Sequence, residues 1–389
     1  METAVSPLPP LALPLASKPK RMLYGDPVRV LGTVAVVLGH VCDMGYLTGD
    51  PNGTLSHTHD WWIYNIVDCL TRWAVPVYIM LSGALLLDPA RHESPGTFYR
   101  KRLARLGVPL VFWSICFILL DVYYNHWHTM GQALQNLVLG KPYPHLHFIF
   151  RIAVLYAFTP AFRVFVKHAS RPLLTATVCI LFAVWSADSV INGFMRTELS
   201  AFARFAPFVS YFLAGYLLRE AYARPGHLKW HALSVILCGL GVAIITGLLC
   251  MNAPDGVQGY PSPQMFLLDF LSPLRIPMAI SAWIFLITIF RYRDPKASRA
   301  GRLCAYLAPT TLGLYLIHPL FREILWTPDN IRNPLATHIH YYFWKWVSIN
   351  EAFPNIWWRI PAYTALVYFL SLGSILLIMK LPYLRRIVE

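Results

Sequence analysis

Residues 24–40 read YGDPVRVLGTVAVVLGH, an apolar stretch that carries an aspartate, an arginine and a histidine. Arg29 and His40 are eleven positions apart, which on an α-helix places them about 20° apart around the axis and about 16 Å apart along it. Asp26 lies one turn before Arg29, and Thr33 continues the same stripe. Charged side chains are costly against lipid, so the stripe is expected to face a protein interior or a water-filled cavity. A purely structural alternative is a buried Asp26–Arg29 ion pair with His40 as a helix-end residue.

The composition of the chain is that of a membrane protein. Of its 389 residues, 56% are hydrophobic and only 13% are charged, whereas soluble domains have about 25% charged residues. We therefore expect an all-α polytopic membrane protein. About ten apolar segments are long enough, or nearly so, to cross a bilayer, which takes about 20 residues. They lie near residues 23–43, 61–87, 106–124, 146–165, 173–190, 205–218, 231–250, 265–290, 303–321 and 358–379.

The basic residues predict the orientation of these spans. About two thirds of the 33 Lys and Arg residues fall on the side that would also hold both termini, and the positive-inside rule assigns that side to the cytoplasm. The net charge of +14 is thus a topology signal, which removes the case for a nucleic-acid partner. Arg29 is then nearer the cytoplasm and His40 lies in the outer half of the first span. We expect a disordered cytoplasmic tail over residues 1–21, since prolines interrupt its apolar part, and a single membrane-embedded domain over residues 22–389.

Two further arginines lie inside apolar segments. Arg72 precedes Pro76, which removes a backbone donor and should kink the second span, and Ser82 and Gly83 should allow a neighbouring helix to approach closely. Arg151 lies in the fourth span. Intramembrane cations are functional by default, so both arginines are candidates for a binding site.

The basic segment 98–106, which includes Arg102 and Arg105, has two readings. It attaches the chain to lipid headgroups, or it docks an anionic cytosolic donor such as the phosphates of coenzyme A. The outer loop 323–357 is rich in aromatic residues, which indicates either an interfacial aromatic belt or a stacking surface for a sugar. The histidine pairs at 57–59 and 126–128 lack complete metal-ligand spacing. We find no phosphate-binding loop, dinucleotide fingerprint or GxSxG nucleophile elbow.

Several stretches together resemble acyltransferase family 3, a family of polytopic bacterial membrane enzymes that modify cell-surface glycans. The family's Asp followed by Arg-x10-His is similar to Asp26, Arg29 and His40. Its R-x-x-V-P-x-F-x-x-x-S-G motif resembles residues 72–83, with Tyr78 where Phe is usual. The motifs K-R-x-x-R-L-x-x-P, Y-F-L-x-G-Y-L-L and G-x-Y-L-I-H resemble residues 101–109, 211–218 and 313–318. The resemblance covers nearly the whole chain in the expected order.

The resemblance implies transfer of an acyl group, taken to be acetyl, from cytosolic acyl-CoA to a hydroxyl of an envelope polysaccharide or glycolipid. It implies a multi-pass protein of the bacterial inner membrane, with acetyl-CoA as donor substrate, membrane lipid as a further partner, and no other cofactor or metal. An imidazole with a near-neutral pKa suits general-base catalysis or transient acyl carriage, and we assign that role to His40. Asp26 would pair with Arg29, whose cation would bind donor phosphates or a developing oxyanion. We further assign donor binding to Arg72, Arg151, Arg102 and Arg105, and contact with or orientation of the acceptor to His318, Ser82 and Tyr315.

Two other classes of function fit the stripe of titratable groups. A transporter or flippase of a lipid-linked sugar would use it as a translocation path. A structural subunit of an envelope-assembly complex would use the histidines only for helix-end packing. Release of free CoA from acetyl-CoA by the purified protein separates the enzyme from both.

Overall fold

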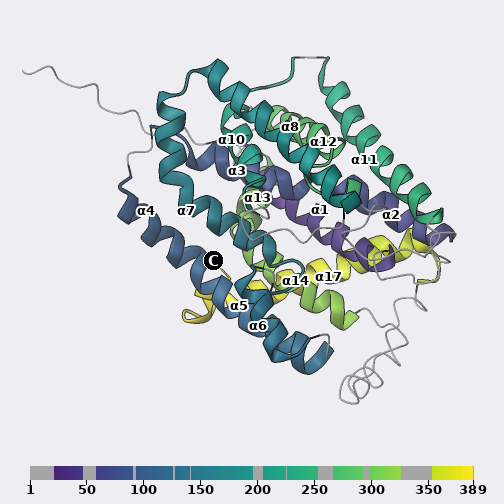
Figure 1. Cartoon of the computed structure of the whole chain (residues 1–389). Coiled ribbons are helices and arrows are strands. Elements are labelled where there is room, and N and C mark those ends of the chain that lie inside the picture. The colour runs from purple at the N-terminus through teal and green to yellow at the C-terminus, as the bar shows by residue number, and fades with distance from the viewer. Residues whose placement is uncertain are drawn as a thin grey trace, which may run out of the picture.

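The computed structural model describes residues 22–46, 58–90, 93–125, 128–140, 142–195, 205–224, 226–252, 266–291, 298–325 and 353–388. Within these ranges every regular element is helical, as expected, and the helices form one bundle (Figure 1). The expected tail at residues 1–21 and most of the aromatic loop 323–357 lie outside the described residues.

The bounds of the α-helices follow in chain order. They are α1 (Gly25–Tyr46), α2 (His59–Thr71), α3 (Ala74–Leu86), α4 (Pro95–Arg102), α5 (Val108–Leu119), α6 (Met130–Val138), α7 (His147–His168), α8 (Arg171–Met195), α10 (Phe208–Leu217), α11 (Leu228–Met251), α12 (Arg275–Phe290), α13 (Arg299–Leu307), α14 (Thr311–Leu325) and α17 (Ile356–Ile378). Two π-helical turns, Leu103–Gly107 and Leu120–Asn125, flank α5, and short 3-10 turns cover Phe266–Leu268, Ala308–Thr310 and Leu384–Ile387.

Eight helical segments of the described chain are long and apolar enough to cross a membrane, which makes the protein a multi-pass membrane protein. Three of the eight combine consecutive elements: α2 with α3, α4 with α5, and α13 with α14. The shorter apolar helices α10 and α12 fall in the expected sixth and eighth spans. At 1.5 Å per residue, α10 is about 15 Å long, half the thickness of a bilayer core. Both helices are shorter than the roughly 20 residues that a crossing requires, so neighbouring segments must complete it.

The second span is interrupted where the sequence predicted a kink. α2 ends at Thr71, Arg72 and Trp73 form a turn, and α3 begins at Ala74. Pro76 has no backbone N–H and its ring clashes with the carbonyl four residues earlier, which belongs to Arg72. The interruption therefore sits one turn before the proline, and it turns the Arg72 side chain back toward α2.

α3 and α10 are in backbone contact through a pair of glycines. A Cβ added to Gly83 would lie 1.8 Å from the Phe212 carbonyl oxygen, and one added to Gly215 would lie 1.9 Å from the Met80 carbonyl oxygen. Only a residue without a side chain fits at either position. The close approach expected from Gly83 is thus confirmed, and it seals one side of the bundle around α1.

Replacing Gly83 with alanine is expected to destabilise the fold by about 1–3 kcal/mol, because a backbone carbonyl cannot move aside without separating the two helices. Thermal unfolding of the purified protein in detergent measures this loss. Gly373→Ala on α17 is the matched control, since a Cβ there meets nothing within 4 Å. Equal unfolding temperatures for the two variants would contradict the packing.

α1 is the centre of the bundle. It contacts α2, α3, α12, α13, α14 and α17, and among its residues Val28, Val37 and Val41 are almost wholly buried. Gly32 faces α3, where a Cβ would lie 2.8 Å from the Tyr78 ring, so the tyrosine lies flat against α1. The polar residues of the opening stretch are therefore held inside protein rather than against lipid.

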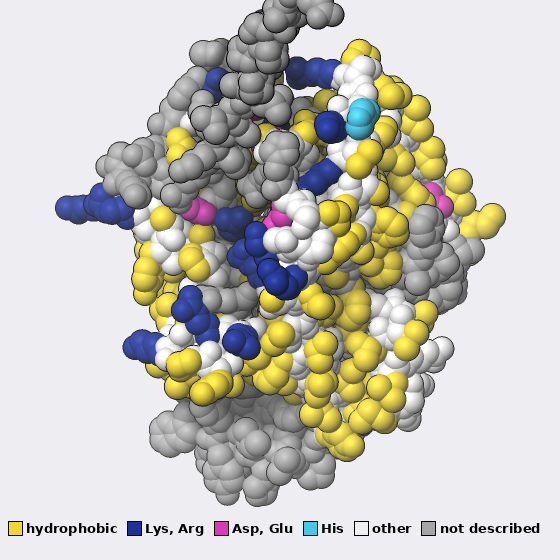
Figure 2. Space-filling model, turned by 90° about the vertical axis from the view of Figure 1, so that its left-hand side faces the viewer, with side chains coloured by type: hydrophobic (Ala, Val, Ile, Leu, Met, Phe, Trp, Pro, Cys, Tyr) yellow, Lys and Arg dark blue, Asp and Glu magenta, His cyan; other side chains and the backbone are white. Residues whose placement is uncertain are grey.

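Lys and Arg side chains gather at one end of the bundle (Figure 2). We call the end that holds Lys101, Arg163 and Arg219 the basic end. Ion pairs join the elements that meet there: Arg219 after α10 pairs with Asp88 after α3, and Glu93 before α4 pairs with Lys101 and Arg163. The hydrogen bond from Lys101 holds the pKa of the Glu93 carboxyl below its usual value. By the positive-inside rule this is the expected cytoplasmic side. The first turn of α1 belongs to it, because the Tyr24 hydroxyl donates to the Arg219 carbonyl.

Candidate active site

A cavity of about 300 Å³ lies next to the basic end, between α1, α3, α7, α14 and the π-helical turn that follows α4. Three arginines contribute to its wall: Arg29, Arg102 and Arg105. Most of the remaining lining is apolar or aromatic, with Ser82 and Tyr315 among the polar exceptions. The cavity thus combines three cations with a largely apolar wall, and it brings together five of the residues predicted from the sequence.

Arg29 projects into this cavity from α1. Its guanidinium lies 3.0 Å from the Asp26 carboxylate and its side chain is 31% exposed. The hydroxyl groups of Thr33 and Tyr78 both donate to the Arg29 backbone carbonyl. The ion pair of the structural alternative is therefore present, but it leaves the cation accessible to a ligand in the cavity.

Arg102 and Arg105 enter the cavity from the other side. The guanidinium of Arg102 lies over the rings of Phe98 and Tyr156, 5.2 and 5.8 Å from their centroids. Arg105 is exposed and lies within the π-helical turn Leu103–Gly107. Such turns occur often at functional sites, because the extra residue in the turn re-aims the side chains. Here the turn coincides with two arginines that face one cavity.

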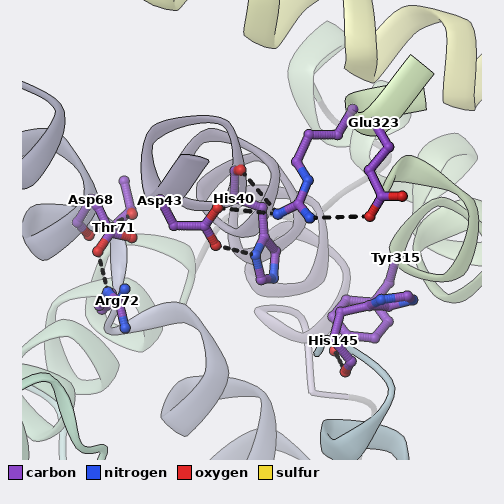
Figure 3. Close-up of polar contacts among 9 residues, drawn as sticks. His40, Asp43, Asp68, Thr71, Arg72, His145, Tyr315 and Glu323 are labelled. Atoms are coloured by element: carbon purple, nitrogen blue, oxygen red, sulfur yellow. Dashed lines mark hydrogen bonds and ion pairs between the residues drawn. The ribbon is translucent and has the colours of Figure 1, made fainter. Parts of the chain in front are cut away.

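Arg72 and Arg151 do not line the cavity. Arg72 forms an ion pair with Asp68, four residues earlier and 3% exposed on α2 (Figure 3). Arg151 stacks on Phe208, with 4.3 Å between its guanidinium carbon and the ring centroid. Each of these half-buried cations therefore has a structural partner in its own part of the bundle, and donor binding by either stays a prediction.

Three histidines gather farther along α1, away from the basic end. The His40 and His318 rings are 5.3 Å apart between centroids, and the His145 ring lies 6.0 Å from that of His318. His318 bonds the Leu314 carbonyl through Nδ1, which leaves its buried Nε2 with no hydrogen-bond partner among the described residues. Both ring nitrogens of the buried His145 are likewise unpartnered within the described chain. Unsatisfied buried polar atoms are rare, so this cluster is suited to a polar ligand or water.

Asp43, which was not among the residues predicted from the sequence, orients the central histidine. Nδ1 of His40 lies 2.9 Å from one carboxylate oxygen of Asp43, as Figure 3 shows. The other carboxylate oxygen accepts from Arg322 at 3.1 Å, and the same guanidinium lies 3.3 Å from the His40 carbonyl. The sequence contained the evidence for this contact, because Asp43 follows His40 by three residues and therefore lies on the same face of the helix.

Arg322 lies in the last turn of α14 and is only 7% exposed. The Arg322 guanidinium also lies 3.5 Å from Glu323, which accepts a hydrogen bond from the Tyr143 hydroxyl. The Tyr363 hydroxyl donates to the backbone carbonyl of Arg322. These contacts join α14, α17 and the turn before α7 around Asp43. The carboxylate that orients His40 is therefore itself fixed from three elements.

This arrangement gives His40 the chemistry of a general base. A carboxylate bound to Nδ1 favours the tautomer that carries its proton there, so Nε2 keeps a free lone pair. Within the described part of the chain, that Nε2 makes no hydrogen bond. Figure 3 also places His145 and Tyr315 together beside His40. Among the described residues, no group of three His, Cys, Asp or Glu side chains is arranged to hold a metal ion.

One residue borders both sites. Tyr315 lines the cavity, and its ring centroid lies 5.8 Å from those of His145 and His318. Its hydroxyl donates to the His145 carbonyl at 2.5 Å. The cavity of the basic end and the histidine cluster are thus neighbours that share one aromatic wall.

A family model for the acyltransferase domain of family 3 matches residues 24–379, which is nearly the whole chain. The chain belongs to acyltransferase family 3. Neither the curated proteins nor the solved structures include a significant match. Tyr78 stands where the family motif has Phe. Its hydroxyl, which Phe lacks, donates a hydrogen bond to the Arg29 carbonyl.

Proposed function

We propose that the protein is an O-acyltransferase of the bacterial inner membrane that moves an acetyl group from cytosolic acetyl-CoA to a hydroxyl of an envelope polysaccharide or glycolipid. The observation that carries the proposal is the cavity with three arginines at the basic end, separated from the His40–Asp43 pair by the Tyr315 wall. Phosphate groups are bound best by arginine, and coenzyme A carries several of them. By its sequence motifs the chain resembles the O-acetyltransferase of enterobacterial common antigen, and we take from this resemblance an envelope glycan as the proposed acceptor.

The proposed reaction uses Nε2 of His40 as the base. It takes the proton of the acceptor hydroxyl while that oxygen attacks the thioester carbonyl, so that the ester C–O bond forms and the C–S bond breaks. The thiolate leaves with the proton that His40 holds, which yields free CoA thiol. In a two-step variant the same nitrogen first accepts the acetyl group and then passes it to the hydroxyl. Asp43 stabilises the imidazolium in either scheme.

The positions of the other side chains assign some of them to the donor and one to the acceptor. Arg29 lies about 16 Å along α1 from His40, too far to touch an oxyanion formed there, so its proposed role is to bind donor phosphates. Arg102, Arg105 and Ser82 share its cavity and belong with the donor. His318 borders His40 and is the proposed contact for a second hydroxyl of the acceptor sugar, which would donate to its Nε2 while the reacting hydroxyl donates to His40.

The test of this function is the release of free CoA from acetyl-CoA by the purified protein, supplied with a glycolipid extract of the cell envelope. We expect CoA release to depend on both substrates and to equal the amount of ester formed. A flippase would instead move a labelled lipid-linked sugar across proteoliposomes and release no CoA, and that result would overturn the proposal.

Arg105→Ala is expected to raise the KM for acetyl-CoA about tenfold and to leave kcat within a factor of two. A charge-assisted hydrogen bond contributes about 1.5–3 kcal/mol when desolvated, and less at an exposed position such as this one. Steady-state kinetics with varied acetyl-CoA measure both constants. Arg100→Ala is the matched control, because Arg100 is exposed on the neighbouring turn but does not line the cavity. An unchanged KM with a reduced kcat would contradict donor binding by Arg105.

A further inference from the structure

Three aromatic side chains, Tyr78, Phe148 and Tyr315, form a layer in the wall of the cavity, and we refer to them as the ring layer. All three line the cavity. The ring centroids of Tyr78 and Phe148 are 6.2 Å apart, and those of Phe148 and Tyr315 are 5.3 Å apart. The three rings come from α3, α7 and α14, so the layer closes the space between three helices.

The histidine cluster lies directly behind this layer. His318 and His145 are each 5.8 Å from the Tyr315 ring, and His40 is 5.3 Å from His318. A thioester whose phosphates are held by the arginines of the cavity must therefore present its acyl end at the ring layer. Whatever follows the carbonyl carbon has to fit among these rings.

The three rings differ in how they are held. The Tyr78 hydroxyl donates to the Arg29 carbonyl and that of Tyr315 donates to the His145 carbonyl, so both tyrosines are tied to backbone. Phe148 lies between them, 9% exposed, and is held by packing alone. Side chains held only by packing can change rotamer, whereas a buried hydroxyl loses about 1–3 kcal/mol of hydrogen bonding if it moves away. Phe148 is therefore the ring whose size and position set the space for the acyl chain.

We infer that Phe148 is the residue that limits the length of the acyl group, so that the protein uses acetyl and excludes medium acyl chains. This inference rests on the proposed acyltransferase function. One additional methylene in an apolar pocket changes specificity by about 10- to 200-fold when no space is left for it. Removal of the Phe148 ring would enlarge the cavity beside Tyr315, the ring that adjoins the histidine cluster, and so supply that space.

The experiment measures CoA release from acetyl-CoA and from hexanoyl-CoA, each with the glycolipid extract of the cell envelope as acceptor, so that each turnover yields a glycan ester and CoA thiol. For the wild type we expect a much higher kcat/KM with acetyl-CoA. Phe148→Ala is expected to raise the hexanoyl-to-acetyl ratio at least tenfold, and Phe148→Leu, which keeps most of the apolar packing, to raise it by less. Phe158→Ala is the matched control, because Phe158 is on the same helix but 56% exposed, and its ratio should equal that of the wild type.

The outcomes separate this inference from the function on which it rests. If the wild type releases CoA from neither thioester, both are overturned. If the wild type is active and both Phe148 variants keep its ratio, only the role of Phe148 is overturned. If Phe148→Ala does not fold, the ratio of Phe148→Leu decides.

Discussion

Replacing His40 with alanine is expected to lower acetyl transfer by about 10²- to 10⁴-fold, the usual contribution of a positioned general base. The loss follows from geometry, because the carboxylate of Asp43 is bound to Nδ1 of His40, and the His40 ring lies in the histidine cluster next to His318. Ester formation with labelled acetyl-CoA measures it. The variant should still insert and bind acetyl-CoA with the affinity of the wild type, since His40 does not line the cavity.

His59→Ala is the control for this substitution. His59 opens α2 with a side chain that is 72% exposed, and its ring lies 3.5 Å from Asp60. Its replacement should leave transfer unchanged. Normal glycan acetylation by His40→Ala would show that the imidazole is not the base, and a loss of folded protein would instead favour a structural role for the opening stretch.

Asp43→Asn is expected to lower kcat by about 10²-fold or more with little change in the KM for acetyl-CoA. An amide in place of the carboxylate can donate to Nδ1, and this favours the tautomer whose proton is on Nε2, the nitrogen that must accept one. The cavity proposed to bind the donor is formed by other residues, so donor affinity should persist. Steady-state kinetics that separate kcat from KM are the measurement.

The matched control is Asp60→Asn, in which the same change is made to a half-exposed carboxylate that pairs with Arg359. It should leave both constants close to those of the wild type. If Asp43→Asn alters KM as strongly as kcat, then the Asp43–Arg322 contact acts by shaping the donor site and not by orienting His40.

The sequence predicted the local part of this site well. Arg29 and His40 do lie on the central helix as helical spacing requires, one in the cavity wall and one in the histidine cluster. The motif arginines 102 and 105 do face the same cavity as Arg29. Spacing along one helix and motifs of a few residues determine these placements, so no tertiary information was needed.

The remaining placements depend on contacts between distant segments. Arg151 is stacked on Phe208 and lies 5.6 Å from the Phe270 centroid, partners that no local pattern indicates. His145 enters the histidine cluster from the turn before α7, where it reads as a loop residue. Asp68, by contrast, is four residues before Arg72, so the sequence contained the evidence for that ion pair.

The activity proposed for this membrane protein is acetylation of an envelope glycan through His40. Mass spectrometry of surface glycans from a deletion strain tests it most directly, with the strain complemented by the wild type, by His40→Ala or by His59→Ala. We predict that one glycan loses an acetyl mass in the deletion strain, regains it with the wild type and His59→Ala, and stays unacetylated with His40→Ala. Identical acetylation in all four strains, or a glycan that is missing instead of unacetylated, would contradict the account.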